Sequence, residues 1–415
     1  MAQQPHATET LTAAIRDFYE RYPYPPAVTD LEPYRQYWSA PGRRRADFHL
    51  HWPWRAFRED YSILVAGCGT DQAGKHAVRW PAAQVTGIDV SAISIRSTAD
   101  LKGRYKLDNL TVRQLAVEGA EELNCQFDQI VCTGVLHHLP DPVRGIRALR
   151  KVLKPEGVLH LMVYAPYGRA GVYMIQEFCR RTGLAATDQG LRQLALALRA
   201  LPADHPVARL LHGAPDFASA AGCADALLNP QDRAYSVPEL FELLESNGLR
   251  FLRWVRQAPY SARCGLLANL PHASHLATLA PREEAAAAEL FRGTMVRHSA
   301  IVCRDDHPWL SRQIQFAGRE SLQVVPLRLP DTVTLRERLP TGTAAALRSR
   351  SHAYADTILP LARHELEFVE AIDGTRTVSD LIATESRAAF AIPLLERLWW
   401  HDQIVFDASA TRPED

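Results

Sequence analysis

Residues 64–75, LVAGCGTDQAGK, contain two glycines that could hold a cofactor at the start of a helix. Leu64 and Val65 end an apolar run, Gly67 and Gly69 mark a tight turn, and small residues then recur at helical spacing. A strand, a glycine turn and a helix together direct backbone N–H groups and the positive end of a helix dipole toward a ligand. The sequence therefore predicts a cofactor site at this turn.

Asp71 narrows the choice of cofactor. With Thr70 and Gln72 it stands where a dinucleotide loop has its third glycine, and an ionised side chain there would repel a pyrophosphate. A P-loop is disfavoured because Lys75 lacks the required glycine spacing. S-adenosylmethionine (SAM) has no phosphate and carries a sulfonium and an ammonium group, so a nearby carboxylate is compatible with it. These residues predict SAM rather than NAD. Asp89, which follows in VTGIDVS, is placed to accept hydrogen bonds from ribose hydroxyls.

The elements that must position these residues alternate between β-rich and helical segments. The β-rich segments are SILVAG, AQVTGIDV, NLTVRQLAV, FDQIVCTGVL and GVLHLMVYA, and charged helical stretches separate them. Such alternation is typical of a parallel sheet with helices on both faces, which binds its ligands at the carboxyl ends of the strands. The sequence predicts an α/β fold with its site at that edge.

The rest of the chain divides by composition into further segments. We expect an N-terminal arm and lid over 1–61, the sheet core over 62–165 and a helical insertion over 166–232. The remainder of the sheet would occupy 233–304, with GTMVRHSAIVCR as its last strand. Short helices and a final strand over 320–410 predict a small winged-helix-like C-terminal module.

The charge balance and the termini limit the partners that we expect. Lysine plus arginine equals aspartate plus glutamate at 47 each, so no nucleic-acid partner is expected. We find neither a signal peptide nor an apolar stretch that could span a bilayer, and the seven scattered cysteines fit a reducing compartment. We therefore expect a cytoplasmic protein without a membrane partner. The oligomeric state stays open, with a homodimer as one candidate.

Four motifs together carry a resemblance. AGCGT, GIDVS, FDQIVCTGVLHHL and LKPEGVL occur in the order and at the spacing of class I SAM-dependent methyltransferases, over roughly residues 60–165. The longer chain, through FYERYPYPP, VYAPYGRAGVY and NPQDRAYSVPELFELLESNGL, is loosely similar to rickettsial-type protein-lysine methyltransferases. The resemblance implies a Rossmann-like, seven-stranded methyltransferase sheet and SAM as the cofactor.

The resemblance also assigns cofactor contacts by motif position. Ala66, Gly67 and Gly69 would line the methionine end of SAM, together with backbone groups of two residues after the fourth strand, Thr133 and Gly134. Asp89 would bind the ribose. The adenine would lie beside Val90 and the acidic residue that follows the third strand, Glu118.

The methyl acceptor is less defined by the sequence. Candidate contacts are Tyr164, Tyr167 and Arg169 after the fifth strand, with Tyr19 and Tyr22 from the arm, where tyrosines could instead simply pack. No single residue stands out as catalytic. We expect a protein side chain, with lysine among the candidates, ahead of a small molecule. The alternative is a noncatalytic SAM-binding scaffold that recruits a partner through its C-terminal module.

Two histidine pairs could suggest a metal, and the pair His137-His138 could also suggest a base. His137 and His138 are adjacent, so on a helix or turn they do not face one site, and at least one of them is expected to be structural. His49 and His51 alternate but have no evident third ligand. The sequence predicts no metal site.

Overall fold

The computed structural model describes residues 5–352, 354–382 and 385–411. The chain forms two compact units. The first comprises the chain up to Tyr34, Asp60–Phe251 and Arg292–Asp306; the second comprises Arg35–Glu59, Leu252–Phe291 and the chain from His307 onward. Each unit is therefore built from separate stretches of sequence.

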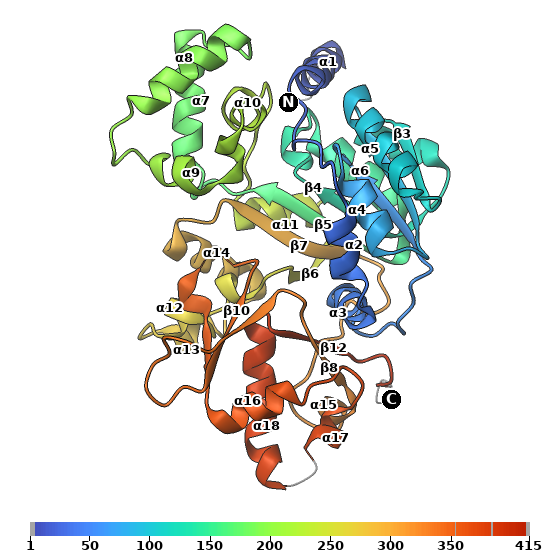
Figure 1. Cartoon of the computed structure of the whole chain (residues 1–415), viewed down its shortest axis with the longest axis vertical. Helices are drawn as coiled ribbons and strands as arrows, with labels where there is room; N and C mark the ends of the chain where they lie inside the picture. Colours follow the sequence, from blue (N-terminus) through green and yellow to red (C-terminus); the bar gives the residue numbers. More distant parts are fainter. Residues whose placement is uncertain (1–4, 353, 383–384, 412–415) are drawn as a thin grey trace. The chain divides into compact units, whose positions relative to one another are not determined.

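A seven-stranded sheet of order β3-β2-β1-β4-β5-β7-β6 runs through the first unit (Figure 1). Strands β1 to β5 are parallel along their pairings, and β7 is antiparallel to β5. The strands are β1 (Ser62–Ala66), β2 (Gln84–Asp89), β3 (Leu110–Gln114), β4 (Phe127–Thr133), β5 (Leu153–Tyr164), β6 (Leu249–Trp254) and β7 (Arg297–Arg304). This is the Rossmann-like methyltransferase sheet that the resemblance implied, so that prediction is confirmed.

The central and edge strands differ in burial, as their positions require. Ile63–Ala66 of β1 and Phe127–Cys132 of β4 are buried throughout, because helices cover both faces of a parallel sheet. In the edge strand β3 only Leu110 is buried. The register pairs Ala66 of β1 with Ile88 of β2, so the glycine turn and Asp89 emerge at the same edge.

Local sequence signals fix the helices beside this sheet. Ser91 caps α5 (Ala92–Tyr105) by accepting the N–H of Ser94, and Asp141 caps α6 (Pro142–Val152) by accepting that of Arg144. Pro142 at the first helical position of α6 suits a site where no backbone donor is needed. The other elements here are α4 (Gln72–Arg79), η1 (Val117–Leu123), η2 (Leu136–His138) and α11 (Val237–Glu245).

A group of helices follows β5. These are α7 (Ala170–Thr182), α8 (Asp188–Arg199), α9 (Ala208–Gly213), η3 (Pro215–Ala218) and α10 (Ala220–Leu228). They share an apolar cluster that includes Val172, Ile175 and Leu194. Gly171 allows the close approach of two segments, because a Cβ there would lie 2.3 Å from the backbone nitrogen of Val207. The N-terminal helix α1 (Pro5–Arg21) packs Phe18 and Tyr22 against Ala224 of α10.

The second unit has its own core. Two small antiparallel sheets, β11-β10-β9 and β12-β8, pack with helices around a buried apolar cluster. Its elements are α2 (Glu32–Trp38), which begins in the first unit, α3 (Pro41–His51), η4 (Ala258–Tyr260), α12 (Gly265–Ala268), α13 (Ala273–Leu276), α14 (Pro281–Arg292), α15 (Glu320–Gln323), β8 (Val325–Arg328), β9 (Thr332–Leu335), β10 (Ala345–Ser349), η5 (Ala355–Thr357), β11 (Leu359–Leu361), α16 (Arg363–Glu370), α17 (Val378–Leu381), α18 (Glu385–Trp400) and β12 (Ile404–Asp407). Its winged-helix character stays a prediction.

Two segments group differently from the boundaries expected from composition. Residues 35–59, which we assigned to the arm, pack in the second unit, where Arg45 and His49 lie 2.7 and 3.2 Å from the carboxylate of Asp407. Residues 252–291, which we assigned to the sheet domain, also belong to the second unit. Composition could not separate them, because the partners that hold these segments lie far away in sequence.

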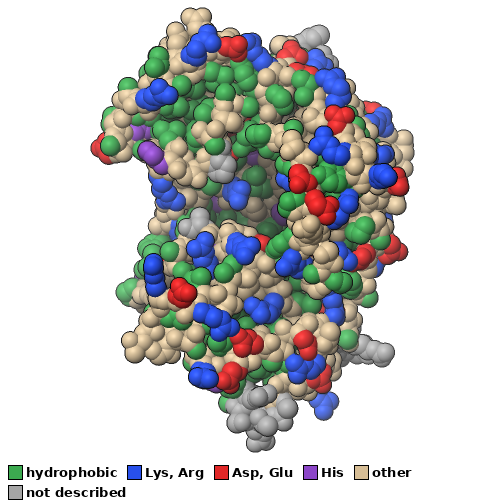
Figure 2. Space-filling view, in the orientation of Figure 1, with side chains coloured by type: hydrophobic (Ala, Val, Ile, Leu, Met, Phe, Trp, Pro, Cys, Tyr) green, Lys and Arg blue, Asp and Glu red, His purple; other side chains and the backbone are tan. Residues whose placement is uncertain are grey.

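The described part of the chain contains neither a three-ligand metal cluster nor a helix that could span a membrane, and the histidines His49 and His51 have backbone partners. Nδ1 of His49 lies 3.1 Å from the carbonyl of Trp52, and Nδ1 of His51 lies 2.8 Å from that of Asp47. The described residues hold no cluster of three or more His, Cys, Asp or Glu side chains suited to a metal ion. Within the same residues, no helix is both long and apolar enough to cross a bilayer. Basic and acidic side chains are interspersed over the face shown in Figure 2.

Candidate active site

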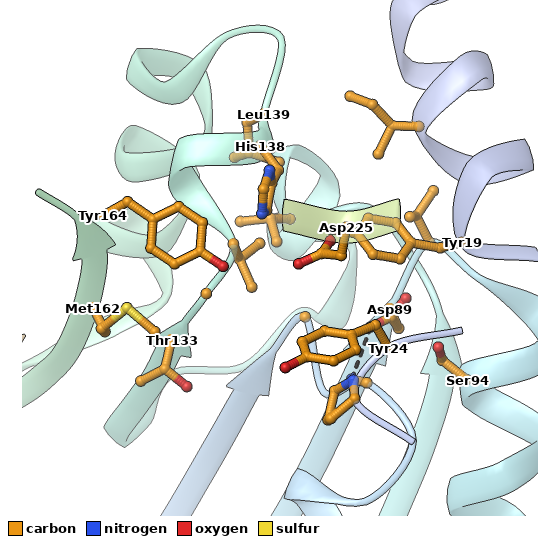
Figure 3. Close-up of a pocket in the computed structure, with 18 of the residues that line it drawn as sticks. Tyr19, Tyr24, Asp89, Ser94, Thr133, His138, Leu139, Met162, Tyr164 and Asp225 are labelled. Carbon is orange, nitrogen blue, oxygen red and sulfur yellow. Dashed lines mark hydrogen bonds between the residues drawn. The ribbon is translucent and has the colours of Figure 1, made fainter. Parts of the chain in front are cut away.

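A cavity of about 320 Å³ opens at the carboxyl ends of β1, β2 and β4 in the first unit (Figure 3). It has two chemically distinct halves. We call the first the glycine-turn half, which is lined by Gly67, Gly69, Asp89, Val90, Ser94, Leu115, Glu118, Thr133 and Gly134. We call the second the tyrosine half, which is lined by Tyr19, Tyr24, His138, Tyr164, Arg169, Asp216 and Asp225.

The backbone of the glycine turn requires residues without a Cβ. Gly67 and Gly69 have φ values of +69° and +54°, and a Cβ on Gly67 would lie 2.3 Å from a methyl group of Val135. The N–H groups of Gly67 and Cys68 both donate to the carbonyl of Ile88, at 2.9 Å. The turn is therefore tied to the end of β2, and it presents bare backbone to the cavity.

Asp89 links the turn to the next helix. One carboxylate oxygen accepts the N–H of Gly69 and the other accepts the N–H of Ser91, each at 2.9 Å. Burial raises the pKa of Asp89. Since a carboxylate can accept about four hydrogen bonds, Asp89 keeps capacity for a hydroxyl of a ligand beside these backbone N–H groups. This is the geometry expected of a ribose-binding carboxylate.

Asp71 does not act as the sequence suggested. Its side chain is only 2% exposed, lies outside the cavity lining, and has an oxygen 2.7 Å from Nζ of Lys75 one helical turn later. Its charge is thus directed at Lys75 rather than at a ligand. The repulsion argument against a pyrophosphate is wrong for this reason, and the choice of cofactor must be made on other features.

Most of the predicted cofactor residues do meet in the glycine-turn half. Seven of them line it: Gly67, Gly69, Asp89, Val90, Glu118, Thr133 and Gly134. The exception is Ala66, which is fully buried at the end of β1 and outside the lining. Burial raises the pKa of Glu118, and the hydroxyl of Thr133 donates to Gln72 at 3.1 Å. Their binding roles stay predictions.

The predicted acceptor residues separate into two groups. Tyr19, Tyr164 and Arg169 line the tyrosine half. Tyr22 does not: its hydroxyl donates to the carbonyl of Ala186 at 3.2 Å, and its ring packs against Phe18. Tyr167 is 43% exposed and also lies outside the cavity lining. Helical periodicity within the arm could not say which tyrosine faces inward.

Tyr164 is held between two partners. Its ring centroid lies 3.8 Å from that of His137, nearly parallel to it, and 3.6 Å from Cζ of Arg169. Two groups so close to one centroid cannot share a face, so they lie on opposite faces of the ring. Arg169 also forms a buried ion pair with Asp232, at 3.2 Å. Burial lowers the pKa of His137 well below its usual value, so this histidine is a neutral packing group.

Two carboxylates of the tyrosine half were missed from the sequence, whereas Tyr24 belongs to the arm tyrosines that we expected either to pack or to form a lid. Asp225 and Asp216 come from α10 and η3, and the hydroxyl of Tyr24 in the arm donates to Asp216. Tyr19 makes the matching contact, with its hydroxyl 2.8 Å from Oδ1 of Asp225. A signal did exist for Asp225, because it is the one charged residue in the otherwise apolar and small run FASAAGCADALL. Burying a lone carboxylate is costly, so its presence in such a run indicates either a hydrogen-bond partner or a functional role.

Comparison with known proteins identifies the domain. Residues 64–159 match the family model described as a methyltransferase domain. Together with the sheet order, this match decides the identification. The chain contains a class I methyltransferase domain. The resemblance in the four sequence motifs is thereby confirmed.

Curated relatives cover parts of the chain. An uncharacterized protein of Synechococcus sp. is 31% identical over 275 residues, which are 59% of this chain and 60% of that protein. The ubiquinone biosynthesis O-methyltransferase of Pseudomonas paraeruginosa is 34% identical over 103 residues, 24% of this chain and 43% of that enzyme. The chain thus spans less than two thirds of the length of either relative.

A solved structure shares the fold over a longer range. PKMT2 from Rickettsia typhi, determined in complex with AdoHcy, covers 89% of this chain and is itself covered to 76%, with a TM-score of 0.59 and 17% sequence identity. The similarity extends well beyond residues 64–159. At this identity it establishes a shared fold.

Proposed function

We propose that the protein transfers the methyl group of SAM to an acceptor that enters the tyrosine half of the cavity. The observation that carries this proposal is one cavity with two halves. Its first half has the glycine turn and ribose-type carboxylate of the methyltransferase fold, and its second half is a partly enclosed polar chamber.

The glycine-turn half fits SAM. Asp89 would accept hydrogen bonds from the ribose hydroxyls, Val90 and Glu118 would flank the adenine, and Gly67 and Gly69 would leave room for the methionine portion. The ligand has no phosphate, so it needs no basic group in this half. Bound SAM would supply an electrophilic methyl group on a sulfonium, and what remains for the protein is to position the acceptor and to exclude water.

The arm supports exclusion of water. Thr12, Ile15, Tyr19 and Tyr24 line the cavity, and the hydroxyl of Thr70 next to the glycine turn donates to the carbonyl of Pro25 at 2.9 Å. The arm thus touches both the turn and the helices after β5. We expect it to act as a lid, with amide hydrogen exchange in residues 5–30 slowing when S-adenosylhomocysteine binds. Exchange that is indifferent to the ligand would reject the lid.

We favour a protein side chain, with lysine among the candidates, as the acceptor. PKMT2 shares its fold with 89% of this chain, well beyond the cofactor-binding core. The similarity to the ubiquinone biosynthesis O-methyltransferase covers a quarter of the chain, so it bears on the cofactor-binding core rather than on the acceptor.

The test is a labelling experiment. Lysate from a strain that lacks the gene would be incubated with the purified protein and SAM that carries a radioactive methyl group. We expect new label in a protein band, and much less of it with the Asp89→Ala variant at a SAM concentration that does not saturate this variant. Label only in the small-molecule fraction would show that the acceptor is a small molecule and not a protein. Tight SAM binding without any label transfer would contradict methyl transfer and favour a noncatalytic scaffold.

A further inference from the structure

Asp225 carries an unused acceptor atom inside the cavity. Its side chain is 3% exposed and lines the tyrosine half. Both neutral donors that reach it, the hydroxyl of Tyr19 at 2.8 Å and the amide of Asn229 at 3.2 Å, bind the same oxygen, Oδ1. Among the residues that the structure describes, none donates to Oδ2. A buried carboxylate oxygen that faces a cavity without a donor is a binding group for a ligand.

His138 offers a second unused atom to the same chamber. Its Nδ1 lies 2.7 Å from the carbonyl oxygen of Gln231. A carbonyl only accepts, so Nδ1 carries the hydrogen, and in this tautomer the lone pair of the ring is on Nε2. The ring lines the cavity, with its centroid 6.3 Å from that of Tyr19 and 5.7 Å from that of Tyr164. Figure 3 shows His138, Asp225, Tyr19 and Tyr164 around the same part of the cavity.

The charges around the tyrosine half determine whether it favours a positively or a negatively charged ligand. Asp216 and Asp225 are bonded by neutral tyrosine hydroxyls, and the cation whose charge acts on Asp225 is His138 when it is protonated, which it is not while Nε2 can still accept a proton. The positive charge of Arg169 is already matched by Asp232, and Arg297 lines the cavity from an exposed position where water screens it. The chamber therefore favours a cation. Burial raises the pKa of Asp225, and a bound cation would offset the cost of ionising that carboxylate.

We propose that Asp225 and His138 form an amine subsite, in which Asp225 binds the ammonium group of the acceptor and Nε2 of His138 takes its proton. The inference rests on the proposed methyl transfer. The acceptor nitrogen gives one proton to Nε2 and uses the freed lone pair to form the N–C bond to the methyl group. The C–S bond breaks as that bond forms, and its electron pair goes to sulfur, which becomes an uncharged thioether. The imidazolium then loses its proton to solvent.

The subsite can be tested without knowing the acceptor. Sinefungin is a SAM analogue that bears an ammonium group where SAM bears its methyl sulfonium, whereas S-adenosylhomocysteine is uncharged there. We expect Asp225→Asn to lower the preference for sinefungin over S-adenosylhomocysteine about tenfold, because a hydrogen bond between charged groups is lost. The affinity for S-adenosylhomocysteine itself should stay within about threefold, since Asp225 lies in the other half.

A matched control separates this effect from net charge. Asp108→Asn makes the same change at an exposed residue before β3, at the amino end of the strands, and should leave the preference unchanged. An unchanged preference in Asp225→Asn would overturn the subsite. Should that variant fail to fold, His138→Asn decides instead: its amide can still donate to Gln231, and an unchanged preference would have the same meaning. If neither analogue binds the wild-type protein, the proposed function itself fails.

The transferred methyl group gives a second readout. Label on the acceptor should survive mild base and be recovered as a methylated amine after acid hydrolysis. Base-labile label, as from a methyl ester, or label on a hydroxyl oxygen would overturn the amine subsite while leaving methyl transfer intact.

Discussion

Two buried aspartates, one in each unit, differ in how many hydrogen-bond partners and nearby positive charges compensate their burial. Asp402 in the second unit is fully buried and accepts the N–H groups of Gln257 and Ala258, at 3.1 and 2.9 Å, with Nε2 of His352 at 3.0 Å. Burial alone would raise its pKa, but His352 and two nearby arginines outweigh burial and lower it. Asp225 in the first unit has neutral donors on one oxygen only, and burial raises its pKa.

The comparison distinguishes structural from functional carboxylates. Asp402 has partners on both oxygens, so its charge stabilises the fold and nothing is left for a ligand. Asp225 keeps one oxygen toward a cavity, which costs stability and offers binding. The predictions below test this difference.

The largest effect is expected at Asp402. Asp402→Asn removes the charge that faces His352 and Arg253, so the free energy of unfolding should fall by about 3–5 kcal/mol in urea titrations at pH 7. Asp108→Asn, at an exposed site, should change it by less than about 0.5 kcal/mol. A loss of under about 1 kcal/mol in Asp402→Asn would mean that the saturated carboxylate is not a stabilising centre.

His138→Asn should act on turnover rather than on folding. Removing the proton-accepting Nε2 is expected to lower the methyl-transfer rate about 100-fold, while an amide that still donates to Gln231 keeps the local structure. The affinity for S-adenosylhomocysteine provides the control and should be nearly unchanged. A rate within about threefold of wild type would exclude His138 as the base.

Asp89→Ala should weaken SAM binding by about 2 kcal/mol in calorimetry, because hydrogen bonds to a charged acceptor are lost. Asp89→Asn should be milder, since one acceptor oxygen remains for the backbone N–H groups that hold the turn. NAD affinity above SAM affinity in the wild-type protein would contradict the cofactor assignment. Unchanged SAM affinity in a folded Asp89→Ala variant would place the ribose elsewhere.

The smallest effect concerns pH and stability, and its sign differs between the two aspartates. The raised pKa of Asp225 means that the folded protein binds the extra proton more readily, so its contribution to stability falls as pH rises through that pKa. Asp225→Asn should therefore stabilise the protein by about 1 kcal/mol at pH 7 and by less near pH 4. For Asp402, whose pKa is lowered, stability is present above the unfolded pKa of about 4 and is lost below it. Urea titrations at pH 7 and pH 4 measure the change in the free energy of unfolding of Asp225→Asn and of Asp402→Asn relative to wild type. A change of the same sign in both variants at pH 7 would contradict the distinction between the two aspartates.

Local sequence determined the sheet and the glycine-turn half of the cavity. The strands read as buried apolar runs because both faces of a central parallel strand are covered, and Gly67 and Gly69 are demanded by backbone conformation. Asp89 could be placed because it directly follows a strand whose end position is fixed by register. These features depend on neighbours in sequence or on the regular geometry of a sheet.

Tertiary structure alone decided the tyrosine half and the direction of individual charges. Asp225 and Tyr19 are 206 residues apart, and Tyr24 and Asp216 are separated by 192, so no local pattern could pair them. Asp71 sits in the predicted turn, yet its carboxylate pairs with Lys75 one helical turn later and lies outside the cavity lining. The sequence carries the chemistry of such side chains, but where each one points depends on packing between distant segments, which local propensity does not encode.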